Sequence, residues 1–298
     1  MLLGVAAVWG TSYGFAKEAV SYYPVLGFLA IRFALTGVCL LWPLLRELKR
    51  GARALLRTGV PLGGILLVIF LCETFGVVYT SAANAAVLIS LCVVITPFVE
   101  WWVFGERPGV LIVAMVGLSA FGVWLLTDGV AIQFNLGDGL ILVAALMRAI
   151  MVASTRKLTR HYTGSTLALT AVQALVVAGG CALLAGVLLP IEALTPSASP
   201  RFWMITLYLV LFCTVFAFFA QNYAVRRTTA TRVSVLMGSE PVFGALFAVL
   251  WFGESLSERG WLGVGLIVVA TLCVALRGTA NNESTPGVAG RDASTARG

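Results

Sequence analysis

The sequence predicts an all-α integral membrane protein in which ten transmembrane helices form two inverted five-helix repeats. Three observations lead to this fold class. Hydrophobic residues make up 60% of the chain and charged residues only 11%, with a mean hydropathy of +0.98, whereas a soluble domain has about 25% charged residues. Apolar runs of about 18 to 23 residues recur along most of the 298 residues, and each is long enough to cross a bilayer as a helix. The two halves also align when one is shifted by 148 residues.

The first five apolar runs define the first predicted repeat, residues 1–127. The chain starts M-L-L-G-V-A-A-V-W-G, without the basic region and A-x-A site of a signal peptide, so we interpret this start as a membrane helix. Each later run ends where polar or charged residues interrupt it. The predicted spans are 2–20, 26–45, 59–80, 82–104 and 110–127.

The second predicted repeat, residues 138–276, contains five further runs bounded in the same way. The predicted spans are 138–156, 166–189, 203–225, 230–252 and 260–276. Residues 278–298 are polar and contain few apolar groups, so we expect a disordered cytoplasmic tail there.

Basic residues in the short loops predict the orientation, because Lys and Arg resist translocation. Fifteen of them fall in the tail and in the loops after the second, fourth, sixth and eighth spans, against three on the opposite side, Lys17, Arg201 and Arg259. Both termini are therefore expected in the cytoplasm. The net charge of +7 follows from this topology and gives no reason to expect a nucleic-acid partner.

The stretch G-T-S-Y-G, residues 10–14, matches the G-x-S-x-G pattern that presents a nucleophilic serine in hydrolases. Ser12, however, lies inside a predicted membrane helix, and the one histidine of the chain, His161, falls in a cytoplasmic loop. No catalytic triad can form from these residues, so we do not expect an enzyme. The same residues also fit G-x-x-x-G, which lets a neighbouring helix approach closely.

The alignment of the halves pairs residues 80–106 with residues 228–254. Glu73 then aligns with Gln221, and the segments ending F-G-E align at Gly105 and Gly253. Each half holds five spans, and an odd number forces the two copies to face opposite ways across the membrane. Inverted repeats of this kind place a binding site near the midplane between the halves and work by alternating access. The repeat by itself therefore predicts transport.

Three segments carry a resemblance to a known family. These are W-G-T-S-Y-G-F-A-K in the first span, I-R-F in the second and E-P-V-F-G-A-L-F-A-V-L-W-F-G-E in the ninth. They resemble the EamA-type transporters of the drug/metabolite transporter superfamily over nearly the whole chain. The resemblance implies two five-helix EamA halves, cytoplasmic termini, and export of small metabolites, amino acids or toxic organic compounds in bacteria.

Four of the charged residues inside predicted spans are candidates for the site, and each needs a partner or a watery cavity because an ionised group at the bilayer centre costs roughly 2.5–3.5 kcal/mol. Arg148 either grips an anionic group of the substrate or pairs with Glu240. Glu73 either carries a coupling proton or attracts a cationic compound, or else forms a structural ion pair with Arg32.

Uncharged polar residues add further candidates for the lining of a cavity, with hydrogen bonding between helices as the alternative role. The six cysteines lie singly in apolar runs without a C-x-x-C pair, so we expect neither a metal site nor a cofactor. The full set of cavity candidates is Tyr13, Glu73, Tyr79, Asn84, Arg148, Gln221, Tyr223 and Glu240.

The predicted function is a secondary transporter in the bacterial inner membrane that exports small metabolites such as amino acids. Alternatives are an efflux carrier for drugs and toxic cations, or a channel-like facilitator. The chain contains no Walker A pattern, so ATP is not the expected energy source. The expected partners are a small-molecule substrate, the lipid bilayer and protons as a candidate coupling ion.

Overall fold

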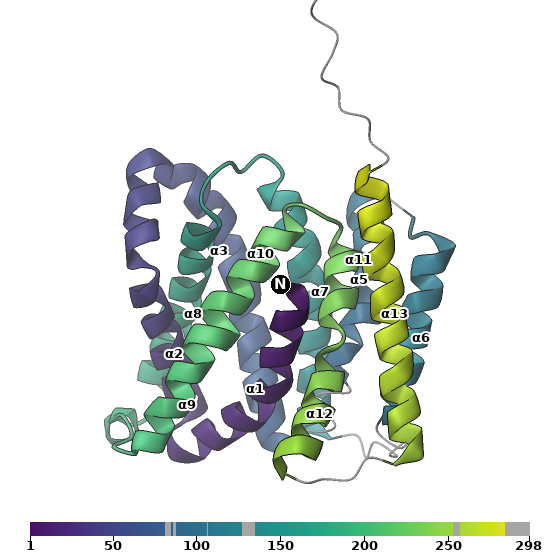
Figure 1. The fold of residues 1–298 in the computed structure, drawn as a ribbon. Coiled ribbons are helices and arrows are strands. Elements are labelled where there is room, and N and C mark those ends of the chain that lie inside the picture. Colours follow the sequence, from purple (N-terminus) through teal and green to yellow (C-terminus); the bar gives the residue numbers. More distant parts are fainter. Residues whose placement is uncertain (81–84, 86–87, 106, 127–134, 253–256, 284–298) are drawn as a thin grey trace, which may run out of the picture.

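The computed structural model of this chain describes residues 1–80, 85, 88–105, 107–126, 135–252 and 257–283. All of the regular secondary structure in these ranges is helical (Figure 1). Helix lies within every one of the ten ranges that the sequence predicts as spans. The predicted all-α architecture is therefore correct for the described part of the chain.

Helices of the first half follow the predicted order, with one bend inside a helix. They are α1 (Leu2–Tyr22), α2 (Val25–Cys39), α3 (Leu41–Tyr79), α5 (Cys92–Phe104) and α6 (Val110–Leu126). The chain turns by 117° between α1 and α2, next to Pro24, which lacks the backbone N–H needed to continue a helix. Helix α3 leaves helical geometry at Gly51, so its first part completes the second predicted span and its second part is the third.

The second half contains two helices that are divided into pieces. Its elements are α7 (Leu136–Thr159), α8 (Thr166–Leu188), η1 (Ile191–Leu194), α9 (Pro200–Val210), η2 (Leu211–Phe216), α10 (Ala217–Val225), α11 (Ala230–Met237), α12 (Glu240–Phe252) and α13 (Glu258–Glu283). The element η2 is a π-helix that joins α9 and α10 into one continuous rod. Helix α13 continues through residues 278–283, which were predicted to belong to the disordered tail.

Among the described residues, four rods are long and apolar enough to cross a membrane alone: Leu41–Tyr79, Leu136–Thr159, Thr166–Leu188 and Pro200–Val225. The bent pair α1 and α2 qualifies when taken together. The fourth and ninth predicted spans, 82–104 and 230–252, each contain a turn among their described residues. The first turn is at Leu91, and the second is at Gly238 and Ser239.

Helices of the two halves pack against each other in matching pairs. Helix α1 packs on α12, and α7 packs on α5; likewise α2 packs on α8, and α6 packs on α13. The first crossing is close because a Cβ on Gly10 would lie 2.7 Å from both the carbonyl oxygen of Glu240 and the backbone nitrogen of Gly244. Gly14 has nothing within 4 Å of such a Cβ. Of the G-x-x-x-G pattern, only the first glycine makes the expected close contact.

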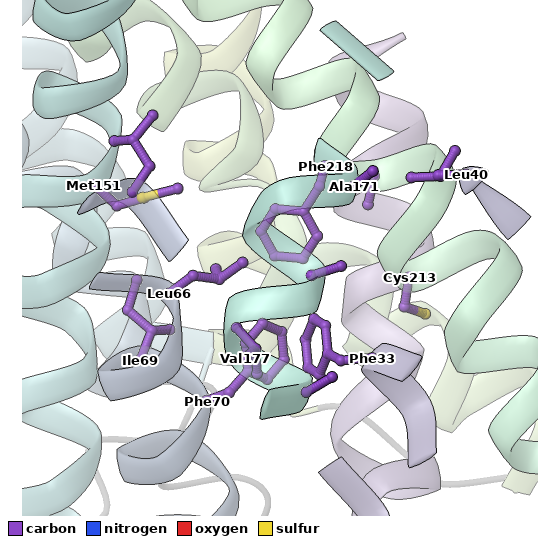
Figure 2. Packing of buried hydrophobic residues seen from close by; sticks show 14 of the residues in the cluster. Phe33, Leu40, Leu66, Ile69, Phe70, Met151, Ala171, Val177, Cys213 and Phe218 are labelled. Carbon is purple, nitrogen blue, oxygen red and sulfur yellow. The ribbon is translucent and has the colours of Figure 1, made fainter. Parts of the chain in front are cut away.

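The largest hydrophobic core lies between α1, α2, α3, α8 and the α9–α10 rod. The rings of Phe33 and Phe70 meet edge to face with centroids 4.6 Å apart (Figure 2). Figure 2 also places Phe218 and Met151 in this cluster, next to the polar site described below. The core thus fixes the positions of α3, which carries Glu73, and α10, which carries Gln221.

The basic loops gather at one end of the molecule. Figure 1 shows the bend of α3 at Gly51, the α10–α11 connection and the C-terminal end of α13 together at the top. The α1–α2 bend lies at the opposite end. We call these the basic end and the opposite end.

Candidate functional site

Arg148 lies at the centre of a cluster of charged groups between the two halves. Its Nη2 donates to both carboxylate oxygens of Glu73 at 3.1 Å, and its Nη1 donates to Oε2 of Glu240 at 3.4 Å. The side chain is contributed by α7, Glu73 by α3 and Glu240 by the first residue of α12. One guanidinium therefore joins three helices and neutralises one of the two negative charges beside it.

Local backbone features bring these three residues together. Helices α3 and α7 approach closely where Gly76 faces Gly137, since a Cβ on Gly137 would lie 2.7 Å from the carbonyl oxygen of Gly76. The break before α12 puts Glu240 at a helix start, where a carboxylate is favoured by the helix dipole. Pro241 follows in the first turn, where its missing N–H costs nothing.

Trp9 covers the guanidinium of Arg148. The centre of that guanidinium lies 4.8 Å from the centroid of the Trp9 ring, a distance at which cation and ring attract each other. The indole nitrogen donates to the carbonyl oxygen of Cys213 at 2.9 Å, within the π-helix η2. π-Helical turns inside α-helices are rare and often mark functional sites.

Two cavities lie on either side of a layer of side chains formed by Trp9, Phe70 and Arg148. The first cavity lies toward the basic end, and its lining includes Leu66, Met151, Phe218, Gln221, Ser234 and Glu240. The second cavity lies toward the opposite end, and its lining includes Ser12, Tyr13, Arg32, Glu73, Thr74 and Val77. Trp9, Phe70 and Arg148 line both cavities and separate them. The centre of a water molecule can occupy about 30 Å³ of the first cavity and about 20 Å³ of the second. This is room for one or two waters in each cavity.

Polar contacts between the halves lie beyond each cavity, toward its own end of the molecule. On the basic side, the Thr96 and Ser234 hydroxyl oxygens lie 2.8 Å apart. Farther out, Glu100 accepts hydrogen bonds from the backbone nitrogens of Ala230 and Thr231 at the start of α11 and forms an ion pair with Arg156.

On the opposite side, Thr80 links three segments. Its hydroxyl donates to Oδ1 of Asp138 at 2.5 Å, and its carbonyl oxygen accepts from Nζ of Lys17 at 3.2 Å. Asp138 is fully buried and caps α7 together with Asn135. The first turn of α7 is thus fixed to the ends of α1 and α3.

Oε1 of Gln221 is buried at the site and has no hydrogen-bond partner among the described residues. The Tyr13 hydroxyl and the Glu240 carboxylate lie beside each other and interact. Leaving a buried polar atom unpaired costs about 1–3 kcal/mol. Oε1 of Gln221 is consequently free to interact with a molecule that enters the first cavity.

Five of the eight predicted cavity residues line the two cavities: Tyr13, Glu73, Arg148, Gln221 and Glu240. Two others lie elsewhere. Tyr79 is 57% exposed at the end of α3, and Tyr223 lies beside Arg227, whose guanidinium is 3.6 Å from the ring centroid. Asn84 lies outside the described residues.

The expected ion pair between Arg32 and Glu73 does not form, because both oxygens of Glu73 bind Arg148 instead. Arg32 donates from Nε to the hydroxyl of Thr214 at 3.0 Å and lies over the rings of Phe33 and Phe70. The expected partner of Arg148, Glu240, does contact it, but Glu73 contacts it more closely.

Sequence reasoning missed Trp9 and the main-chain carbonyl that holds it. The available signal was position: Trp9 lies well inside a span, whereas tryptophans of the interfacial belt lie near span ends. Ser12, by contrast, donates its hydroxyl to the carbonyl oxygen of Trp9 within α1. No group of three or more His, Cys, Asp or Glu that could bind a metal occurs in the described ranges.

A comparison with protein families matches residues 1–128 and 135–276 to the EamA-like transporter family. The chain belongs to this family. It is therefore a membrane transporter, as the resemblance of its motifs predicted. Its two matched regions contribute different walls of the site, since Glu73 lies in the first and Arg148 and Glu240 lie in the second.

Relatives with this architecture occur in archaea and bacteria. An uncharacterized transporter of Archaeoglobus fulgidus is 26% identical over 276 residues, which cover 92% of this chain and 84% of the relative. The uncharacterized inner membrane transporter YedA of Escherichia coli is 26% identical over 283 residues, covering 92% and 89%. A crystal structure with 20% identity superimposes with a TM-score of 0.74 over 95% of this chain and 98% of the other, which supports the fold.

Proposed function

We propose that this EamA-family protein is a secondary transporter that exports small metabolites, such as amino acids or related compounds, by alternating access. The observation that carries the proposal is the pair of cavities separated by one layer of side chains around Arg148. A carrier needs a site that can open to either side in turn, and inverted-repeat carriers place it between their halves. Here contacts between helices of different halves lie beyond each cavity, toward its own end of the molecule.

Several features support two inverted five-helix repeats. Leu91 and Ser239, where the fourth and ninth spans break, are 148 residues apart, the same shift that aligns the two halves of the sequence. The packing pairs α1 with α12 and α7 with α5 exchange with each other under that shift. Both relations are expected if the halves are related by a twofold axis in the membrane plane.

Ten crossings with both termini in the cytoplasm agree with the basic loops at one end of the molecule. A bacterial inner membrane agrees with the printed name of YedA. In this orientation the first cavity faces the cytoplasm and the second faces the outside, so export moves a substrate from the first to the second.

The chemistry of the first cavity favours a substrate with a hydrogen-bond donor, such as an amino group. The unpaired acceptor oxygen of Gln221 faces it, while Trp9 and Phe218 provide apolar and aromatic surface. The same features favour the alternative of cationic drug efflux. A channel-like facilitator fits less well, because the Arg148 layer interrupts the path.

Counterflow in proteoliposomes tests the proposal. Vesicles containing the purified chain are preloaded with single amino acids or with the cationic compound ethidium, and uptake of the labelled compound is measured. A carrier should show saturable uptake that rises several-fold when unlabelled substrate is present on the other side. Uptake that rises linearly with concentration and ignores the trans side would support a channel and contradict the proposal.

A further inference from the structure

Arg32 is a buried cation without a carboxylate partner among the described residues. Arg32 lies on α2, and 5% of its surface is exposed. The contacts found for its guanidinium are the Nε hydrogen bond to Thr214 and the rings of Phe33 and Phe70, 5.6 and 5.1 Å from its centre. The Nη1 and Nη2 groups make no hydrogen bond to the described residues, although Arg32 lines the second cavity.

These contacts compensate only part of the cost of burying the charge. A cation over an aromatic ring and one hydrogen bond to a neutral hydroxyl each contribute only a small stabilisation. Together they are smaller than the cost of transferring a guanidinium from water into a protein interior. An anion beside Nη1 and Nη2 would remove most of that deficit.

The other charged groups around the second cavity are already engaged with one another. Both oxygens of Glu73 bind Nη2 of Arg148, and Glu240 binds its Nη1. The Tyr13 hydroxyl lies beside the Glu240 carboxylate. The terminal nitrogens of Arg32 are therefore the donors of this cavity that remain unused by the described residues.

The orientation of the Arg32 guanidinium is fixed by its hydrogen bond to Thr214. Thr214 belongs to the π-helix η2, and its hydroxyl also donates to the carbonyl oxygen of Leu209. With its proton used in that bond, the Thr214 oxygen accepts from Nε and holds the planar fork in place. The two terminal nitrogens then remain available as a pair, the geometry that recognises a carboxylate.

We propose that the terminal nitrogens of Arg32 form a subsite in the second cavity that binds the carboxylate group of the substrate. This inference rests on the proposed transport function and assigns to Arg32 the anion-binding role that the sequence suggested for Arg148. Arg148 is occupied by Glu73 and Glu240 and serves to hold the layer between the cavities. The substrate class is thereby narrowed to small carboxylates, including compounds that also carry an amino group.

A thermal-unfolding experiment on the purified full-length chain in detergent tests the subsite. The probe is formate, the smallest carboxylate, and formamide is the neutral control of nearly the same shape. Ionic strength is held constant with sodium chloride, whose anion carries no carboxylate. Formate at 100 mM should raise the melting temperature by about 2–4 °C, and formamide should not.

Three variants identify the residue responsible. Arg32→Gln should abolish the formate shift, and Arg32→Lys should keep a reduced shift because the charge remains but the fork is lost. Arg226→Gln is the matched control: Arg226 also contacts only neutral groups, the carbonyl oxygens of Tyr162 and Gly164 and the Thr166 hydroxyl, but it lines neither cavity. This control should retain the full shift even if its own melting temperature falls.

The outcomes separate the subsite from the transport function. Equal effects of formate and formamide on the unmodified chain, or a full formate shift in Arg32→Gln, would overturn the subsite. If Arg32→Gln does not give a monodisperse protein, the formate shifts of Arg32→Lys and Arg226→Gln are compared instead. A full shift in Arg32→Lys, equal to that of Arg226→Gln, would then overturn the subsite. Counterflow without a formate shift would leave the transport function standing alone. A formate shift without counterflow of any tested compound would instead overturn that function.

Discussion

At the scale of single residues, the site depends on one arginine shared by two carboxylates. The fork of Arg148 makes two contacts to Glu73 and one longer contact to Glu240, so the two carboxylates are not equivalent. Removing one partner of a buried ion pair destabilises more than the pair itself contributes, because a charge is left uncompensated. Different substitutions in this cluster should therefore have clearly different costs.

Arg148→Met should lower the free energy of unfolding by about 3–5 kcal/mol, because two buried carboxylates would face each other without a cation. Glu240→Gln should cost only about 1 kcal/mol, since Arg148 keeps both bonds to Glu73. Denaturant titration of the purified variants in detergent measures both values. Similar losses for the two variants would show that Arg148 does not hold the cluster together.

Glu73→Gln should abolish accumulation driven by a pH gradient while leaving counterflow intact. Gln221, the repeat partner of Glu73, has the same shape but cannot titrate, so one half alone would carry the coupling proton. Because Arg148 would still pair with Glu240, the variant should fold. Both activities are measured on one proteoliposome preparation. Equal loss of both would remove the coupling role.

Sequence reasoning found most of these residues but assigned one partner wrongly. Hydropathy gives the depth of Arg32, Glu73 and Arg148 in their spans, and similar depth suggested the Arg32–Glu73 pair. Which arginine meets Glu73 depends on the rotation of each helix about its axis. That rotation is set by close contacts such as Gly76 against Gly137, which a single sequence does not reveal.

At the scale of elements, breaks in helices matter more than their lengths. The sequence predicted where helices lie because apolar runs are long, but the runs themselves do not show the turns at Leu91 and Ser239. Proline marks one turn and not the other: Pro241 comes just after the second turn, whereas Pro97 lies inside α5. A break is defined by the packing of neighbouring helices as well as by proline, so composition alone cannot place it.

Gly10→Ala should impair folding and transport, whereas Gly14→Ala should be nearly neutral. A Cβ on Gly10 would lie 2.7 Å from main-chain atoms of Glu240 and Gly244, which cannot move without separating α1 from α12. Gly14 lies one turn further along α1 and faces open space. Yield after size-exclusion chromatography and counterflow rates compare the two variants. A well-folded, fully active Gly10→Ala would show that this crossing tolerates a shift.

At the scale of the whole molecule, the orientation follows from the distribution of charge. A reporter that is active only in the cytoplasm should work when fused after Arg277 and fail when inserted near Pro196, in the loop of the opposite end. The reverse pattern would contradict the cytoplasmic position of the termini, and activity at both positions would contradict the odd number of crossings between them. Enzyme assays on whole cells give the result directly.

Transport by alternating access requires that the contacts between the halves beyond the first cavity separate in every cycle. Thr96 on α5 and Ser234 on α11 come from different halves, and their hydroxyl oxygens lie 2.8 Å apart, close enough for a disulfide between cysteines at these positions. In a background without the six native cysteines, Thr96→Cys with Ser234→Cys should lose at least 90% of counterflow upon oxidation and regain it with a reducing agent. Each single substitution should respond to neither treatment. Full activity of the cross-linked double variant would mean that this face of the molecule never opens, and the two cavities would then not be the alternating halves of one pathway.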